Sequence, residues 1–176
     1  MALQLGADDR MSKQSRLLFV LLGALGLFLA GDLAQAATVV ALGASNTFGK
    51  GVAPGEAYPA QLEAMLHAKG INATVVNAGI NGDTTEGMLA RLDSAVPKGT
   101  SVVILQPGGN DMRKGRPDQT AAIQGRLRTM GVRIVMCPNS MFRGLPHQPD
   151  GQHLTPEGYH MLASKLVGQV AGALRR

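Results

Sequence analysis

The stretch "TVVALGASNTFGKG", residues 38–51, joins an apolar run to a turn made of small residues. Residues 38–42 are apolar or β-branched, which favours a buried strand. Gly43 and Ala44 then allow the backbone to turn sharply and leave the short side chain of Ser45 at the tip of the turn. This position suits a nucleophile, and it suits an ordinary strand-to-loop turn equally well. The choice between the two depends on the rest of the chain.

The segment before this strand has the three parts of a secretory signal peptide. Lys13 and Arg16 form a basic region, residues 17–31 are apolar or glycine, and Ala34-Gln35-Ala36 supplies small residues for cleavage. A membrane anchor is the alternative, but a span needs about 20 apolar residues and this run is shorter. We therefore predict a signal peptide at 1–36, a single domain at 37–176, and a periplasmic or secreted protein without a stable membrane anchor.

Composition narrows the class of partners. The net charge is +5, and the basic residues are scattered apart from loose clusters at 113–116 and 126–133. Two tyrosines, four phenylalanines and no tryptophan offer no stacking platform for nucleic acid, which is therefore not expected as a partner. The charge favours a solvated surface with some affinity for anionic substrates or for the cell envelope. Cys137 is the only cysteine, so no internal disulfide is expected, and it is interpreted as a core residue.

Short β-rich runs alternate along the chain with segments of helical periodicity. Thr155 and Pro156 are typical of a helix start, and an apolar stripe follows them. The pattern predicts a three-layer α/β/α, flavodoxin-like parallel sheet of four to five strands with helices on both faces. The strands are predicted at 38–42, 73–76, 101–105 and 132–137, and the helices at 56–69, 84–95, 119–130 and from 156 onward.

Polar clusters follow the predicted strands, at the edge of a parallel sheet where ligands meet the loops. They lie at residues 43–46, 77–84, 106–111 and 150–153. Taken singly, each cluster reads as ordinary turn chemistry, because Gly accepts positive φ and Asn and Asp bond nearby backbone. Taken together, a serine, an amide donor, a glycine-rich loop and an Asp/His pair are the groups that acyl transfer requires.

These clusters resemble the sequence blocks of the SGNH (GDSL-type) hydrolase family in their order and in their residues. Gly43-Ala44-Ser45 is similar to the nucleophile block, and "NAGINGDTT" at 77–85 is similar to the second block. Gly108-Gly109-Asn110-Asp111 fits the family's G-x-N-D, and Asp150-x-x-His153 fits its D-x-x-H. Four ordered blocks are a specific signal, whereas G-x-S alone would be weak.

The resemblance implies a role for each of five residues. Ser45 would be the nucleophile, with His153 as the base and Asp150 as the acid that orients it. The oxyanion hole would consist of the Ser45 and Gly82 backbone N–H groups and the Asn110 side-chain amide. The implied activity is hydrolysis of short to medium acyl esters or thioesters, as in small periplasmic thioesterase, lysophospholipase and arylesterase members. No metal or organic cofactor is expected. The protein is expected to be a monomer, and its implied partner is a small-molecule ester or thioester.

The chain departs from the family at Ala44, where the family has Asp, and in the short segment from Asn110 to Asp150. The short segment leaves little room for a fifth strand, and four strands in the order 2-1-3-4 would suffice. Two other functions stay open: a carbohydrate or peptidoglycan O-acetyl esterase using the same residues, and an exported non-catalytic binding module. A metal site at His147, Asp150 and His153 is disfavoured, because a loop with this spacing is a poor cage.

Overall fold

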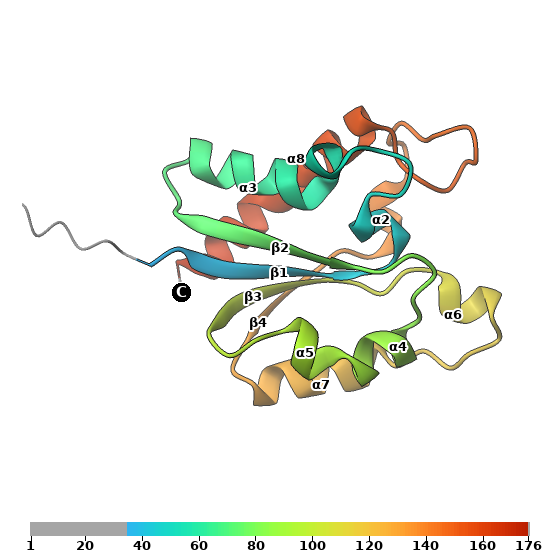
Figure 1. The fold of residues 1–176 in the computed structure, drawn as a ribbon, viewed down its shortest axis with the longest axis horizontal. Helices are drawn as coiled ribbons and strands as arrows, with labels where there is room; N and C mark the ends of the chain where they lie inside the picture. The colour runs from blue at the N-terminus through green and yellow to red at the C-terminus, as the bar shows by residue number, and fades with distance from the viewer. Residues whose placement is uncertain (1–34, 176) are drawn as a thin grey trace, which may run out of the picture. The chain divides into compact units, whose positions relative to one another are not determined.

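The computed structural model describes residues 35–175, so the predicted signal peptide lies almost entirely outside the described residues and stays a prediction. Four parallel strands form one sheet in the order β2-β1-β3-β4 (Figure 1). This confirms the predicted order 2-1-3-4, and residues 35–175 contain no fifth strand. The strands are β1 (Ala37–Gly43), β2 (Ala73–Gly79), β3 (Thr100–Gln106) and β4 (Arg133–Met136).

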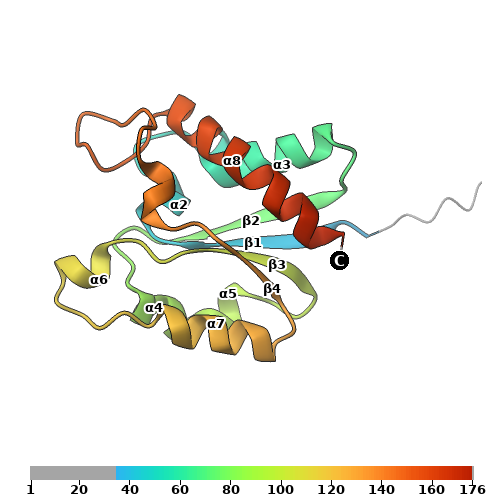
Figure 2. The same cartoon turned by 180° about the vertical axis from the view of Figure 1, so that it is seen from behind.

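Helices cover both faces of the sheet, which confirms the predicted three-layer arrangement (Figures 1 and 2). Side chains of β1 alternate between two buried clusters, with Val39 and Ala41 in one and Val40 and Leu42 in the other. This double burial explains why β1 and β3 read as continuous apolar runs. One layer contains α3 (Tyr58–Ala68) and α8 (Pro156–Leu174), and the other contains α4 (Thr85–Ala90), α5 (Leu92–Ala95) and α7 (Thr120–Thr129).

Helix α8 begins where its sequence predicts. The Thr155 hydroxyl accepts a hydrogen bond from the Gly158 N–H at 3.2 Å, and Pro156 occupies the first turn. Gly158 packs closely against the preceding loop, since an added Cβ would lie 2.3 Å from the Pro146 carbonyl oxygen. The cap and this contact fix the start of α8 directly after the Asp/His segment.

No helix between residues 35 and 175 has both the length and the apolar character needed to cross a membrane.

Two predicted helices are interrupted. The helix predicted at 56–69 is a 3₁₀ turn, Pro54–Glu56, followed by α3, and Ala57 between them is extended. Pro59 lies in the first turn of α3, where proline fits because its missing N–H would have no partner there, so the helix begins at Tyr58. The helix predicted at 84–95 divides into α4 and α5 at Arg91, whose backbone N–H closes α4.

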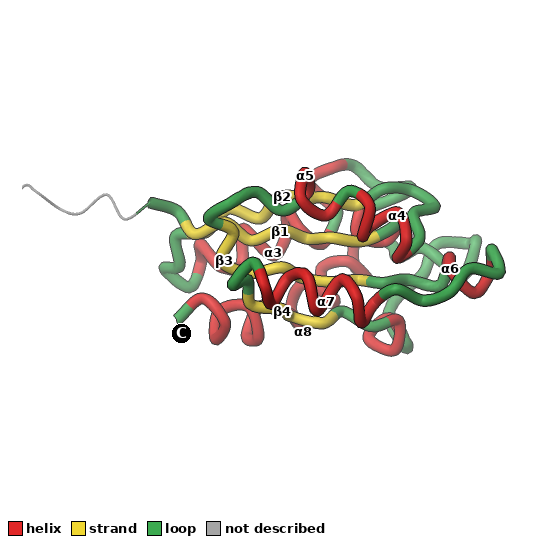
Figure 3. Tube along the Cα trace, turned by 90° about the horizontal axis from the view of Figure 1, so that it is seen from below, coloured by secondary structure: helices red, strands yellow, loops and turns green. Residues whose placement is uncertain are grey.

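Three short elements were not predicted from the sequence, because four residues are too few to show helical periodicity. They are α2 (Ser45–Phe48), α6 (Asn110–Arg113) and the 3₁₀ turn η2 (Asn139–Phe142). Helices α2 and α6 begin just beyond the carboxyl ends of β1 and β3 and lie at the same end of the sheet (Figure 1). Figure 3 shows α6 among the loops that gather at this end. This end therefore brings together the polar clusters of the sequence.

Candidate active site

The turn after β1 places Ser45 as the first residue of α2. Gly43 makes this turn possible, because an added Cβ would lie 2.2 Å from Thr47 Oγ1 and 2.8 Å from Gln106 Oε1. Ser45 is buried, and its backbone N–H donates no hydrogen bond within residues 35–175. The turn thus presents a hydroxyl and a free N–H on the same residue.

Ser45, His153 and Asp150 form a continuous hydrogen-bonded chain. His153 Nε2 lies 2.9 Å from Ser45 Oγ, and His153 Nδ1 lies 2.5 Å from Asp150 Oδ2. The imidazole is buried, with 4% of its surface exposed, whereas the carboxylate is 46% exposed. Because Asp150 faces Nδ1, it favours the tautomer that carries its proton there and leaves Nε2 to accept from the serine hydroxyl.

The Asp150 carboxylate is held as an anion by donors around it. Its Oδ1 accepts the backbone N–H groups of His153 and Gln152, each at 2.9 Å, and its Oδ2 accepts from the imidazole. The His153 backbone N–H contributes most, followed by its side chain, and together these donors hold the pKa of Asp150 well below its ordinary value. The carboxylate is therefore charged throughout the neutral pH range.

Asn46 connects the serine turn to the histidine loop. Its Nδ2 donates to the Gln152 carbonyl oxygen at 3.2 Å, and its Oδ1 accepts the Tyr159 hydroxyl of α8 at 3.1 Å. One side chain therefore links α2, the loop that carries His153, and the final helix. No local pattern in the sequence indicates this role for Asn46, because its partners lie more than a hundred positions away along the chain.

The loop before α8 is pinned by an isolated β-bridge between His147 and Leu154. The Gln148 N–H donates to the His153 carbonyl oxygen at 2.7 Å, and His147 Nδ1 lies 2.7 Å from the Leu145 carbonyl oxygen. His147 is thus engaged by backbone beside the Asp/His pair. Between residues 35 and 175, no three His, Cys, Asp or Glu side chains group closely enough to hold a metal ion.

Cys137 is completely buried, which agrees with its interpretation as a core residue. Burial raises the pKa of its thiol to about 12, so the thiol stays protonated at neutral pH.

Asn110 begins α6 and is buried, and both ends of its amide are fixed. Its Nδ2 donates to the Asp83 carbonyl oxygen at 2.6 Å, and Arg113 Nη2 donates to its Oδ1. These two contacts determine which end of the amide is the donor, and one N–H of Nδ2 remains for a ligand. Gly82 directly precedes Asp83, adopts a φ of 74°, and its N–H donates no hydrogen bond within the described residues.

Two side-chain networks hold the loops after β2 and β3 together. Arg91 forms an ion pair with Asp83 at 2.8 Å and donates to the carbonyl oxygens of Ala78 and Gly43, at 2.9 and 3.3 Å. It therefore ties the ends of β1 and β2 to the loop containing Gly82. In the second network, Asp111 Oδ1 accepts from both the backbone N–H and the hydroxyl of Thr85 at 3.0 Å. The sequence offered no signal for either network beyond the residue types.

Gln106, the last residue of β3, accepts two hydrogen bonds from the serine turn. Its Oε1 accepts the Ala44 backbone N–H and the Thr47 hydroxyl, each at 3.1 Å, and the residue is 2% exposed. In the sequence, Gln106 belongs to one of the polar clusters, but nothing there indicates that it binds the serine turn. The buried amide of Gln106 thus holds the serine turn at the end of β3.

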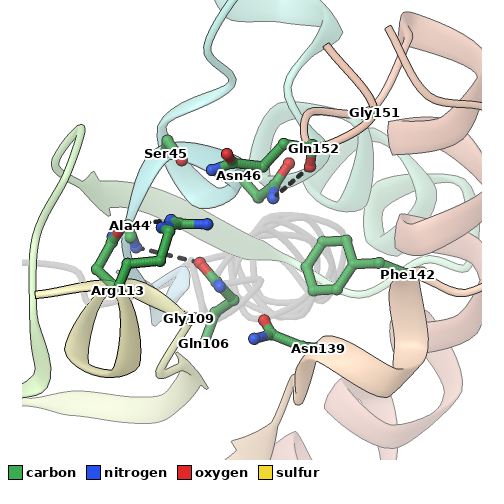
Figure 4. A pocket seen from close by; sticks show the side chains of 12 residues that line it. Ala44, Ser45, Asn46, Gln106, Gly109, Arg113, Asn139, Phe142, Gly151 and Gln152 are labelled. Atoms are coloured by element: carbon green, nitrogen blue, oxygen red, sulfur yellow. Dashed lines mark hydrogen bonds between the residues drawn. The ribbon is translucent and has the colours of Figure 1, made fainter. Parts of the chain in front are cut away.

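A cavity of about 210 Å³ lies beside Ser45 (Figure 4). Ser45 and Asn110 both line it, whereas Gly82 does not and is connected to it through the bond between Asp83 and Asn110. The structure therefore brings four of the five predicted site residues into one hydrogen-bonded or cavity-lining group, and Gly82 stands next to it. Other residues around the cavity include Ala44, Gln106, Arg113, Asn139 and Phe142.

Comparison with known proteins gives a family and several relatives. The model of the GDSL-like lipase/acylhydrolase family matches residues 41–154, which is more than half of the chain. Esterase TesA of Pseudomonas aeruginosa is 32% identical over 123 residues, 66% of this chain and 61% of the relative. The chain thus spans less than two thirds of the length of this relative.

Solved structures show the same architecture. AlinE4, described as an SGNH-hydrolase family esterase, is 26% identical, with a TM-score of 0.58 over 81% of this chain and 98% of its own. The psychrotrophic esterase EstA from Pseudoalteromonas sp. is 18% identical, with a TM-score of 0.68 over 79% of this chain and 99% of its own. At that identity the second likeness concerns the fold alone.

Proposed function

Because the chain belongs to the GDSL-like lipase/acylhydrolase family, we propose that it is a serine esterase or thioesterase acting on short to medium acyl groups. The observation that carries this proposal is the 2.9 Å contact between Ser45 Oγ and His153 Nε2, with Asp150 on the opposite nitrogen. These contacts join a hydroxyl to a base, and the base to a group that orients it. Such an arrangement activates the hydroxyl as a nucleophile.

The reaction follows from these contacts. His153 takes the proton of Ser45 as the hydroxyl oxygen attacks the acyl carbonyl, and Asp150 stabilises the imidazolium that forms. The tetrahedral oxyanion accepts hydrogen bonds from the Ser45 and Gly82 N–H groups and from Asn110 Nδ2. His153 then donates its proton to the departing alcohol or thiol. Water, activated by the same imidazole, releases the acyl group and restores Ser45.

The cavity supports a short acyl group. Its volume of about 210 Å³ is below the roughly 300–1,000 Å³ typical of ligand pockets. Ala44 and Phe142 supply apolar surface on its walls.

Hydrolysis of p-nitrophenyl acetate, butyrate, octanoate and decanoate tests the proposal, and we expect kcat/KM to be highest for the two shorter esters. A folded protein that turns over none of these esters faster than its Ser45→Ala variant would favour the non-catalytic binding module.

We expect Asp150→Asn to lower kcat by up to about 10⁴-fold, because a neutral amide neither stabilises the imidazolium nor enforces its tautomer. The same substitution should change the pH dependence of stability. Asp150 has a lowered pKa in the folded protein, so it stabilises the fold above the ordinary aspartate pKa of about 4. That contribution is lost as the pH falls from there toward the lowered pKa.

Thermal melts at pH 7 and pH 3 measure this change beside steady-state kinetics at pH 7. The difference in Tm between the wild type and Asp150→Asn should be present at pH 7 and should shrink at pH 3. Asp118→Asn is the matched control, because hydrogen bonds from Thr120 also lower the pKa of Asp118, outside the proposed triad. The control should lose pH-dependent stability and keep its turnover. Normal turnover in Asp150→Asn would remove Asp150 from the mechanism.

Export to the periplasm or beyond is part of the proposal. The basic region, the short apolar run and Ala34-Gln35-Ala36 motivate it, and β1 begins directly after them at Ala37. The intact mass of protein recovered from the cell envelope should correspond to a chain that begins at Ala37. Recovery of a chain that retains residues 17–31 in a membrane fraction would contradict cleavage.

A further inference from the structure

The cavity beside Ser45 is lined by one cation and by no carboxylate. That cation, Arg113, donates to Asn110 Oδ1 and makes no ion pair within residues 35–175. Three other arginines do pair with carboxylates, namely Arg91, Arg116 and Arg126. Arg113 is exposed, so solvent and not a protein carboxylate balances its positive charge at the edge of the cavity. Figure 4 shows its side chain among those that surround the cavity.

A second donor in the same cavity lacks a protein acceptor. Gln106 is 2% exposed, and its Oε1 is occupied by the Ala44 N–H and the Thr47 hydroxyl. These bonds fix the amide, so that Nε2 is the end left for the cavity that Gln106 lines (Figure 4). Within the described part of the chain, Nε2 donates to no protein atom. Because Gln106 lines the cavity, its Nε2 N–H groups are available to a ligand that supplies an acceptor.

We propose that the substrate carries a carboxylate, which Arg113 and Gln106 bind while Ser45 attacks the ester. This inference rests on the proposed function and names its substrate class. A guanidinium matches the planar carboxylate, and an amide N–H adds a further donor. One cation balances one negative charge, and a cavity of about 210 Å³ suits a small anionic group. Ala44 lines the same cavity, so the serine turn adds no negative charge that would compete with the substrate.

Two matched pairs of esters test the proposal. The first pair, 4-acetoxybenzoate and 4-acetoxybenzamide, places the carboxylate or its neutral counterpart on the alcohol side. The second, monoethyl succinate and ethyl succinamate, places it on the acyl side. For each pair, the ratio of the two kcat/KM values reports the preference for the anion. The ratio cancels any effect of Arg113 on Asn110, because both esters in a pair use the same oxyanion donors.

For at least one pair, we expect the wild type to prefer the anionic ester about tenfold, the order of one charge-assisted hydrogen bond. Arg113→Gln should abolish this preference, and Arg113→Lys should retain part of it. Gln106→Glu keeps an oxygen for the Ala44 N–H and the Thr47 hydroxyl but replaces the donor with an anion, so the preference should invert. Arg116→Gln is the matched control, because Arg116 belongs to the same basic cluster but pairs with Glu86.

The outcomes separate this inference from the proposed function. Equal rates on both members of both pairs, or a preference that survives Arg113→Gln, would overturn the carboxylate site and leave the esterase standing. Loss of the preference in Arg116→Gln as well would also overturn it, since the effect would then be general surface charge. If the wild type hydrolyses p-nitrophenyl acetate but none of the four esters, the carboxylate site falls and the esterase stands, whereas failure on all five esters would overturn both proposals. Circular dichroism of each variant establishes that the compared proteins are folded.

Discussion

Ser45→Ala is expected to lower kcat for p-nitrophenyl butyrate by about 10⁴- to 10⁶-fold, because it removes the atom that forms the acyl intermediate. His153→Ala should cost about as much, since Ser45 Oγ then has no base at 2.9 Å. The double variant should be little worse than either single one, because residues that act as a unit lose their function together. Steady-state kinetics of the three variants, each purified to the same standard, measures this pattern.

Ser164→Ala is the matched control for the loss of Ser45. Ser164 is exposed on α8, and its hydroxyl donates to the His160 carbonyl oxygen of the preceding turn. Its removal should leave kcat unchanged. If Ser45→Ala retained most of the activity, or if the losses in the double variant were additive, the chain of contacts from Ser45 to Asp150 would not be the reacting unit.

Asn110→Ala is expected to lower kcat by about 10²- to 10³-fold with little change in KM. Its amide would meet charge that develops only in the transition state, and an interaction of that kind affects kcat. The effect should be large because Asn110 is buried and its amide is oriented in advance by Asp83 and Arg113. Kinetics and a thermal melt on one preparation separate this result from a loss of folded protein.

Asn77→Ala provides the comparison for a purely structural asparagine. Its Nδ2 donates to the Phe48 carbonyl oxygen at 3.2 Å, and its Oδ1 accepts the Gly79 N–H at 3.0 Å. We expect this variant to have a lower Tm and normal turnover per folded molecule. The same outcome for Asn110→Ala would assign Asn110 to the turn alone and remove it from the oxyanion hole.

The fold followed from the sequence where local pattern and burial agree. The strands β1 and β3 are buried on both faces, and α8 carries its own cap and apolar stripe, so each is specified by neighbouring residues. The interruption at Arg91 was missed for a different reason. At Arg91 the side chain reaches the ends of two strands, and no period in a single helix reveals such a contact.

The candidate site could be predicted as a set of positions but not as a network. Parallel strands end at one edge, which was enough to expect the serine, the amide and the Asp/His pair to meet there. The partners of Gln106, Asn46 and Asp111 depend on how side chains pack between loops distant in sequence. Arg113 appeared in the sequence only as part of a basic cluster, and its place in the cavity comes from the short helix α6.

The most direct test of the central claim is to locate the adduct formed with a fluorophosphonate probe by intact mass and peptide mapping. We expect one adduct per chain, on Ser45, no labelling of Ser45→Ala, and slow labelling of His153→Ala. An adduct on Ser140 or Ser164, or labelling that survives Ser45→Ala, would contradict it.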